Sequence, residues 1–413
     1  MHWRMNAMKQ AIKCGKLFDS QNGKVLEDKV VIIEDKTIYD VIDLREFAQE
    51  PDMEVIDLSD KFVTPGLTDL HVHSGMNGEG NDRMDLLHHT PAELTLYSLK
   101  NVQQDLYAGF TTLRDCGSQA FVSVALRDAI NKGDFEGPRM FVSGYALGST
   151  GGHADSHYAP GVTCTAEEHP IIDGPDSARK AARFNLKNGA DFLKFMSTGG
   201  VMSKGTTLGA QQLCDDEIAA IIEIANLYGV HTATHAHGTN GIKAAVRAGV
   251  TTVEHGMILD EEAIELMLEH GTYLTPTIIA AERICVKGPE MGLIPWMVEK
   301  ANQALSHHEW GFRQCLEKGV PITFGTDSAT PYNYHGKQGY EFELLQRFGM
   351  DPHKALVAAT MTNAKVLGVD KTQGSVEKGK AADLCAWSCD PMEDVKTMQN
   401  CLFVMKEGVV VKH

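Results

Sequence analysis

The stretch PGLTDLHVH at 65–73 is the first of eight apolar segments that decide the fold. The other seven are FTTLRDCG at 110–117, RMFVSGYA at 139–146, DFLKFMS at 191–197, HTATHAHG at 231–238, TTVEHG at 251–256, TYLTPT at 272–277 and PITFGTDS at 321–328. Amphipathic stretches such as DEIAAIIEIANLYG lie between them and close on Gly, as helices commonly do. Because strand-like and helix-like segments alternate, the sequence predicts an α/β fold with a parallel sheet, and eight such units predict a (β/α)8 TIM barrel.

Both ends of the chain are rich in β-type segments. KVVIIED and MEVIDL precede residue 64, and NCLFVMKEGVVVKH ends the chain; all are short and separated by turn signals. We expect the two termini to form one composite β-sandwich from 1–64 and 372–413, beside a barrel at 65–371.

The composition limits the possible partners. The 413 residues include 38 Lys and Arg against 55 Asp and Glu, a formal net charge of −17, which argues against nucleic-acid or anionic-membrane binding. Spanning a bilayer takes about 18 uninterrupted apolar residues, and the sequence contains no such run. The nine Cys are scattered without a CxxC pair, which argues against a disulfide framework and favours reduced thiols. We therefore expect a soluble, cytoplasmic protein.

Residues that can bind a metal recur at the ends of the predicted strands. The set comprises His71, His73, Lys194, His235, His237, His255 and Asp327. A barrel brings these strand ends to one mouth. Each residue alone is compatible with packing or capping, but packing needs do not explain the whole set. Imidazole and carboxylate ligands suit a divalent ion such as zinc, and the lack of Cys ligands favours an open, catalytic site.

Lys194 lies in an apolar strand and has two possible states. Two ions about 3.5–4 Å apart repel each other and need an anionic bridge. An uncharged lysine amine can add carbon dioxide to give a carbamate with two oxygens, which would supply that bridge. The alternative is that Lys194 stays an ammonium group near the barrel mouth.

The motifs PGLTDLHVH, DFLKFMSTGG, THAHG, VEHG, FGTD and GSVEKGKAADL, in this order along the chain, resemble the amidohydrolase superfamily of metal-dependent hydrolases. The resemblance implies a barrel with a terminal β-sandwich and two divalent ions, which we expect to be Zn²⁺. It also implies the ligands: His71, His73 and Asp327 for the more buried ion, His235 and His255 for the second, and carboxylated Lys194 between them. All six positions are filled, which argues against a barrel that serves only as a structural or binding module.

GGHADSH at 151–157 and FLKFMSTGGVMS at 192–203 resemble the branch with prolidase-like Xaa-Pro dipeptidases and arginine carboxypeptidases. This predicts hydrolysis of a peptide-like amide, in a dipeptide or an N-acyl amino acid. The alternative is a cyclic or other non-peptide amide, as in imidazolonepropionase. Such hydrolases usually carry HAE where this chain has HAH, with His237 at the Glu position, which disfavours the alternative.

The resemblance also suggests catalytic roles. A hydroxide bridging the two metals would attack the carbonyl, and Asp327 would accept its proton and pass it to the departing amine. His237 and His153 are candidates for holding the carbonyl oxygen or a substrate carboxylate, and Tyr228 is a further candidate for the carboxylate. Each of these three could instead be only solvated or locally hydrogen-bonded. His335, in a loop at the barrel mouth, could touch substrate, and relatives suggest a homo-oligomer.

Other histidines are expected to have no role in the reaction. His231 begins a strand, four residues before His235, and should point away from the metals or lie below them. His307 and His308 are predicted on a charged helix face.

Overall fold

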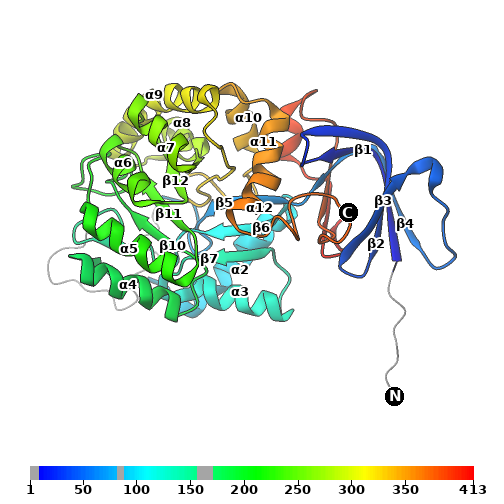
Figure 1. Ribbon diagram of the computed structural model, residues 1–413, viewed down its shortest axis with the longest axis horizontal. Helices are drawn as coiled ribbons and strands as arrows, with labels where there is room; N and C mark the ends of the chain where they lie inside the picture. Colours follow the sequence, from blue (N-terminus) through cyan, green and yellow to red (C-terminus); the bar gives the residue numbers. More distant parts are fainter. Residues whose placement is uncertain (1–8, 81–87, 156–170) are drawn as a thin grey trace, which may run out of the picture.

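The computed structural model describes residues 9–80, 88–155 and 171–413. A large α/β lobe adjoins a smaller β lobe that contains both ends of the described chain (Figure 1). The large lobe holds two parallel sheets of barrel strands and a short two-stranded parallel sheet of β8 (Gly148–Ser149) and β9 (Ile171–Ile172). The first contains β5 (Leu67–Val72), β6 (Phe110–Asp115) and β7 (Arg139–Val142), and the second contains β10 (Leu193–Met196), β11 (Thr232–Ala236), β12 (Thr252–His255) and β13 (Tyr273–Thr275).

Parallel bridges join the two sheets into a closed barrel. On one side Leu147 pairs with Phe195, and on the other the segment 321–328 pairs through Ile322 with β13 and through Ser328 with β5. The eight predicted segments therefore form the barrel in the predicted order. The eighth is irregular, because the Phe324 N–H donates to the Asn363 side chain and Asp327 takes a left-handed φ of 58°.

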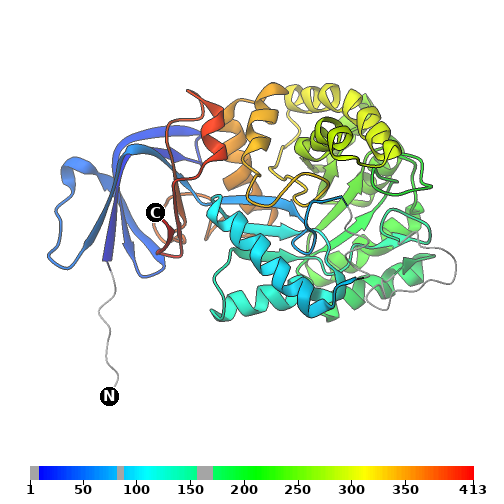
Figure 2. The ribbon, with the colours of Figure 1, turned by 180° about the vertical axis from the view of Figure 1, so that it is seen from behind.

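Helices surround the barrel strands in both views (Figure 1, Figure 2). They are α2 (Pro91–Tyr107), α3 (Val122–Lys132), α4 (Pro175–Lys187), α5 (Asp215–Tyr228), α6 (Thr239–Ala248), α7 (Glu261–His270), α8 (Ile278–Met291), α9 (Pro295–Lys318), α10 (Tyr340–Arg347), α11 (Pro352–Val357) and α12 (Asn363–Val366). Gly229, Gly249 and Gly271 end α5, α6 and α7 with left-handed φ values, as the sequence predicts. No helix of the described ranges is long and apolar enough to cross a lipid bilayer.

The small lobe is one seven-stranded sheet in the order β16-β15-β14-β4-β1-β2-β3. Its strands are β1 (Lys9–Asp19), β2 (Lys24–Glu34), β3 (Thr37–Asp43), β4 (Glu54–Pro65), β14 (Leu384–Trp387), β15 (Phe403–Lys406) and β16 (Val409–Lys412). The two termini meet where β14 pairs antiparallel with β4, with Trp387 opposite Phe62. The predicted β domain shared by both termini is thus confirmed. Buried Phe18, Phe62 and Trp387 belong to the same hydrophobic cluster as the barrel, which fixes this lobe against it.

Candidate metal centre

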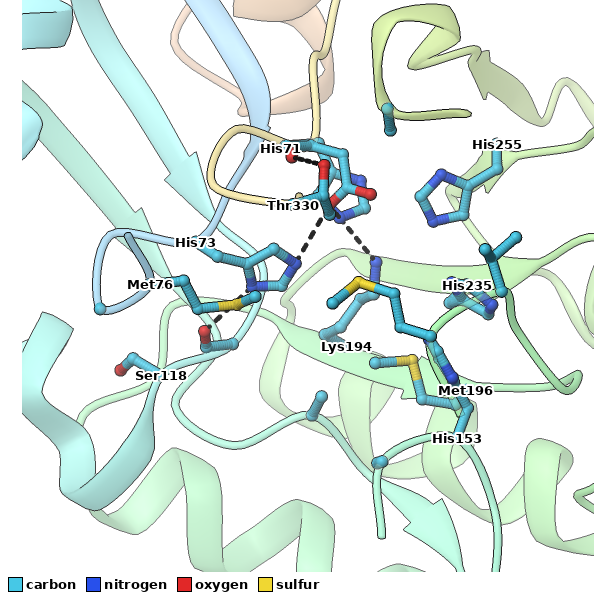
Figure 3. Close-up of a pocket in the computed structure, with 18 of the residues that line it drawn as sticks. His71, His73, Met76, Ser118, His153, Lys194, Met196, His235, His255 and Thr330 are labelled. Atoms are coloured by element: carbon cyan, nitrogen blue, oxygen red, sulfur yellow. Dashed lines mark hydrogen bonds and ion pairs between the residues drawn. The ribbon is translucent and has the colours of Figure 1, made fainter. Parts of the chain in front are cut away.

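The predicted ligands converge on one cavity of ≈ 240 Å³ at the carboxyl ends of the barrel strands. All six predicted ligands line it, and so does the predicted substrate contact His237; the ligands are His71, His73, Lys194, His235, His255 and Asp327. Figure 3 shows the labelled histidines and Lys194 directed toward the same space. The barrel thus gathers side chains from β5, β10, β11, β12 and the 321–328 segment, which are far apart along the chain.

His71, His73 and Asp327 form the most compact group. Oδ1 of Asp327 lies 3.4 Å from Nε2 of His71 and 3.2 Å from Nε2 of His73. One ligand atom from each residue falls within 4.8 Å of the others, so the three side chains can hold one ion together. The second ring nitrogen of His73 faces the Gly117 carbonyl oxygen at 3.2 Å, which leaves Nε2 for the cavity.

His235 and His255 form the second pair. Their ring centroids are 4.6 Å apart, and Nδ1 of His255 lies 2.7 Å from Oγ1 of Thr277. Nε2 of His235 is buried and has no hydrogen-bond partner among the described residues. A buried nitrogen without a partner is expected of a metal ligand, so the donor set fits the divalent ions that the sequence motifs imply.

The side chain of Lys194 lies next to the ligand residues and is 1% exposed. Its Nζ atom is 3.4 Å from Nε2 of His71. Its charge also contributes, after burial, to lowering the pKa values of His235 and His255. Lys194 therefore lies beside His71 and close enough to His235 and His255 for its charge to affect them.

For His71, His235, His255 and Asp327 the electrostatics favour the protonation states that bind metals. Burial and the nearby Lys194 lower the pKa of His71 to about 4, and burial with neighbouring imidazoles lowers those of His235 and His255 well below the ordinary value. Burial alone would raise the pKa of Asp327, but His71 and His73 lower it to about 2. For His73 the Asp327 carboxylate outweighs burial and raises the pKa. Neutral imidazoles and an ionised carboxylate are the forms that coordinate metals.

Two residues that support His71, Glu254 and Arg114, were not predicted from the sequence. Oε2 of Glu254 lies 2.8 Å from Nδ1 of His71, and its Oε1 lies 2.7 Å from Nη2 of Arg114. Arg114 also donates to the Leu70 carbonyl oxygen at 2.6 Å, and both charged side chains are fully buried. A signal existed, because the predicted segments FTTLRDCG and TTVEHG carry Arg114 and Glu254, two charges of opposite sign inside the barrel strands.

His153 lies on the same wall as His235. Their rings stack with centroids 4.2 Å apart, and Nδ1 of His153 lies 2.9 Å from Oγ of Ser203. A Cβ atom on Gly200 would come within 2.4 Å of the His153 ring, so only glycine allows this approach. Lys300 holds the same segment, donating to the carbonyl oxygens of Ser203 at 2.8 Å and Thr206 at 2.6 Å.

The structure does not bring Tyr228 to the cavity. Tyr228 is the last residue of α5 and is 57% exposed. Residues between a helix and the following strand lie at the amino-terminal end of that strand, opposite the barrel mouth. The predicted contact of Tyr228 with a substrate carboxylate is therefore not supported.

His335 has a supporting position. Its Nδ1 atom lies 2.8 Å from Oδ2 of Asp105 and its Nε2 atom 3.3 Å from the His73 carbonyl oxygen. The side chain is buried and does not line the cavity. His335 therefore braces the backbone at His73, and its predicted contact with substrate is not supported.

The predicted exposure of His308 is wrong. His308 is fully buried on the apolar face of α9, in line with Ala301, Ala304 and Phe312, and its ring meets that of Phe348 edge-on. Burial, with a contribution from His237, lowers its pKa to about 3. The spacing of these buried positions, three and four residues apart, would have indicated the buried face.

Comparisons with known proteins agree with this architecture. The sequence profile of the amidohydrolase family matches residues 62–411. Ochratoxinase of Aspergillus niger is 31% identical over 354 residues, 82% of this chain and 72% of that protein. A solved Xaa-Pro dipeptidase with methionine bound in its active site superposes with a TM-score of 0.90 at 35% identity, covering 98% of this chain and 100% of that chain. A prolidase complexed with N-methylphosphonate-L-proline superposes with a TM-score of 0.89 at 29% identity, over 98% and 100% of the two chains.

Proposed function

Because this chain belongs to the amidohydrolase family, and is a hydrolase of that superfamily, we propose that it cleaves a peptide-like amide in a dipeptide or an N-acyl amino acid. The observation that carries the proposal is the convergence of His71, His73, Lys194, His235, His255 and Asp327 on one cavity. The likeness to a Xaa-Pro dipeptidase and a prolidase over nearly the whole chain supports a peptide-like substrate.

The proposed centre contains two divalent ions, most simply Zn²⁺. His71, His73 and Asp327 would hold one ion, His235 and His255 the other, and carboxylated Lys194 would touch both. Bound there, the ions would polarise the scissile carbonyl and make a water molecule acidic enough to act as nucleophile near neutral pH.

Carboxylation of Lys194 is supported by its surroundings. The amine is buried beside imidazoles, and among the described residues it forms no ion pair with a carboxylate. A buried ammonium without a counter-charge is costly, whereas a carbamate carries negative charge and two oxygen ligands. The proposed modification removes the buried cation and supplies the anionic group that two neighbouring ions require.

Asp327 is the proposed proton carrier. Its low pKa keeps it ionised at neutral pH, so it can accept a proton from the attacking water. The same carboxyl group then donates that proton to the nitrogen of the departing amine. Its Oδ1 atom, near both His71 and His73, is close to the centre of the ligand set.

His153 and His237 are the proposed contacts of the carbonyl oxygen or of a substrate carboxylate. Both line the cavity, and Nδ1 of His237 has no hydrogen-bond partner among the described residues. The His237 backbone N–H donates to Oγ1 of Thr198 at 2.9 Å, which fixes the residue at the end of β11. Each imidazole can donate one hydrogen bond to an oxygen of the substrate.

A panel assay tests the proposed function. Protein reconstituted with Zn²⁺ in bicarbonate buffer is incubated with dipeptides, including Xaa-Pro substrates, with N-acyl amino acids and with lactams. We expect amide cleavage in the first two classes and bound metal by mass spectrometry. Turnover of lactams alone would instead favour the cyclic-amide alternative, in which the enzyme resembles imidazolonepropionase.

We also propose a cytoplasmic location and a homo-oligomeric state. Every cysteine of the described ranges is a free thiol, which is consistent with a reducing compartment. Fractionation of the source cells and light scattering of the purified protein test these two points.

A further inference from the structure

The lining of the cavity contains apolar as well as ionisable side chains. The ionisable side chains gather at the centre described above, and the larger apolar side chains of the lining include Met76, Met196, Val201, Met202, Met257 and Ile284. We call these six residues the apolar wall. Figure 3 shows two of its members, Met76 and Met196, beside the histidines and Lys194.

Three of the six residues of the apolar wall are held in place by packing. Val201, Met257 and Ile284 are less than one-tenth exposed and belong to a hydrophobic cluster that also contains Leu293 and Tyr332. This cluster continues behind the cavity along α8 and α9, so the wall is supported by packing from outside. A supported apolar surface gives a ligand a place to bury hydrocarbon without first reorganising the protein.

Charged groups on the lining are few outside the centre. Apart from the six predicted ligands, His153 and His237, the described lining residues include one further carboxylate or amine side chain, that of Asp155. The Gly151 N–H donates to its Oδ2 atom at 2.7 Å. A substrate carboxylate side chain would meet no cation on the apolar wall, and a substrate ammonium group could only turn toward Asp155.

We infer that the enzyme selects amides that carry a neutral, apolar side chain next to the scissile bond, with that side chain packed on the apolar wall. Methionines form four of the six positions, and their unbranched, polarisable side chains adapt to different shapes. The expected substrates are therefore leucyl, methionyl or phenylalanyl compounds, with little discrimination among them. This inference rests on the proposed function and narrows its substrate class.

Selectivity is measured with side chains of similar length. Two substrate series are compared. The first consists of the N-acetyl derivatives of methionine, glutamine, glutamate and lysine. In the second, the same four residues supply the acyl side of the scissile bond of a dipeptide. In at least one series kcat/KM for methionine should exceed that for each of the others by at least about tenfold. Fastest cleavage of charged substrates, or no discrimination in either series, would overturn the inference, and a preference for lysine would point to Asp155 as the selecting group.

A matched pair of variants locates the effect. Met202 is partly exposed in the cavity, so Met202→Lys places a cation on the apolar wall, whereas Met291→Lys places it at the exposed end of α8. Relative to methionine, the glutamate substrate should gain at least about tenfold in the first variant and nothing in the second. Equal behaviour of the two variants would contradict the assignment of the wall.

Calorimetric binding of N-acetyl-L-methionine separates this inference from the proposed function. If no amide is cleaved, the proposed function fails. The binding comparison then still tests whether the apolar wall prefers an apolar side chain to a charged one. Tighter binding of N-acetyl-L-methionine than of N-acetyl-L-glutamate and N-acetyl-L-lysine supports the inference, and equal or weaker binding overturns it.

Discussion

Nδ1 of His71 lies 2.8 Å from Oε2 of Glu254, and both side chains are buried. The carboxylate accepts the proton of Nδ1, so the lone pair of Nε2 faces Asp327 and Lys194. Burial alone would raise the pKa of Glu254, but Arg114 and His71 hold it well below the ordinary value. One hydrogen bond to a buried carboxylate thus fixes both the tautomer and the orientation of a proposed ligand.

We expect Glu254→Gln to weaken metal binding about 10- to 100-fold, because His71 loses its anionic partner. Arg114 would then be a buried cation without a counter-charge, which should lower the free energy of unfolding by about 3–5 kcal/mol. Metal-competition titration and chemical denaturation measure the two effects. Glu262→Gln, on an exposed side chain, is the control and should change stability by less than about 1 kcal/mol. Equal metal affinity of the two variants would refute the role of Glu254.

Asp327→Asn should keep the fold and bound metal but lower turnover at least about 100-fold, because an amide cannot accept the proton. The measurement is kcat at matched metal content, on the fastest substrate of the panel. Asp176→Asn, a fully exposed carboxylate on α4, should retain normal turnover. Near-normal kcat in the Asp327 variant would eliminate the proposed proton carrier.

Lys194→Ala should lose bound metal, since the proposed carbamate disappears with the amine. Small carboxylic acids such as acetate should restore part of the metal content and activity by occupying the space of the carbamate. Metal stoichiometry by mass spectrometry, with and without acetate, is the measurement. Lys187→Ala, at the exposed end of α4, serves as control. An unchanged metal stoichiometry would show that Lys194 is not a bridge.

Lys300→Met should impair catalysis without unfolding the protein. Lys300 donates hydrogen bonds to the carbonyl oxygens of Ser203 and Thr206. The Ser203 hydroxyl in turn contacts the His153 ring. We expect kcat/KM to fall about tenfold and Lys300→Arg to recover part of the loss, since guanidinium also donates to carbonyl oxygens.

The control for Lys300 is Lys287→Met, on an exposed side chain of α8. Thermal unfolding of all three variants separates a positioning effect from a general loss of stability. If kcat/KM of Lys300→Met equals that of the control, the segment does not depend on Lys300.

The stability of the metal-free protein should fall as the pH falls from about 6.5 toward about 3. Burial lowers the pKa of His308 to about 3, so the unfolded chain binds a proton in this window while the folded chain does not. His308→Asn should reduce the slope of unfolding free energy against pH by up to about 1.4 kcal/mol per pH unit. Urea denaturation between pH 6 and 4.5 measures it. His307→Asn, its exposed neighbour, should keep the original slope, and identical slopes in both variants would contradict the prediction.

Much of the architecture could be predicted from local patterns. The eight apolar segments, the glycines after the helices and the β-rich termini indicated the barrel and the shared terminal sheet, both of which the structure confirms. His71, His73, Lys194, His235, His255 and Asp327 could be grouped because carboxyl ends of barrel strands must meet. That argument needs only the order of the strands, which follows the order of the apolar segments along the chain.

The sequence by itself determined which strands form and which residues are candidate ligands. Tertiary structure alone decided that Arg114 pairs with Glu254, that Lys300 reaches the segment beside His153, and that Tyr228 lies away from the cavity. The physical reason is that local periodicity fixes the face on which a side chain lies, whereas its partner is set by the packing of elements distant along the chain. Glu254 and Arg114 are 140 residues apart, and only closure of the barrel brings them within hydrogen-bonding distance.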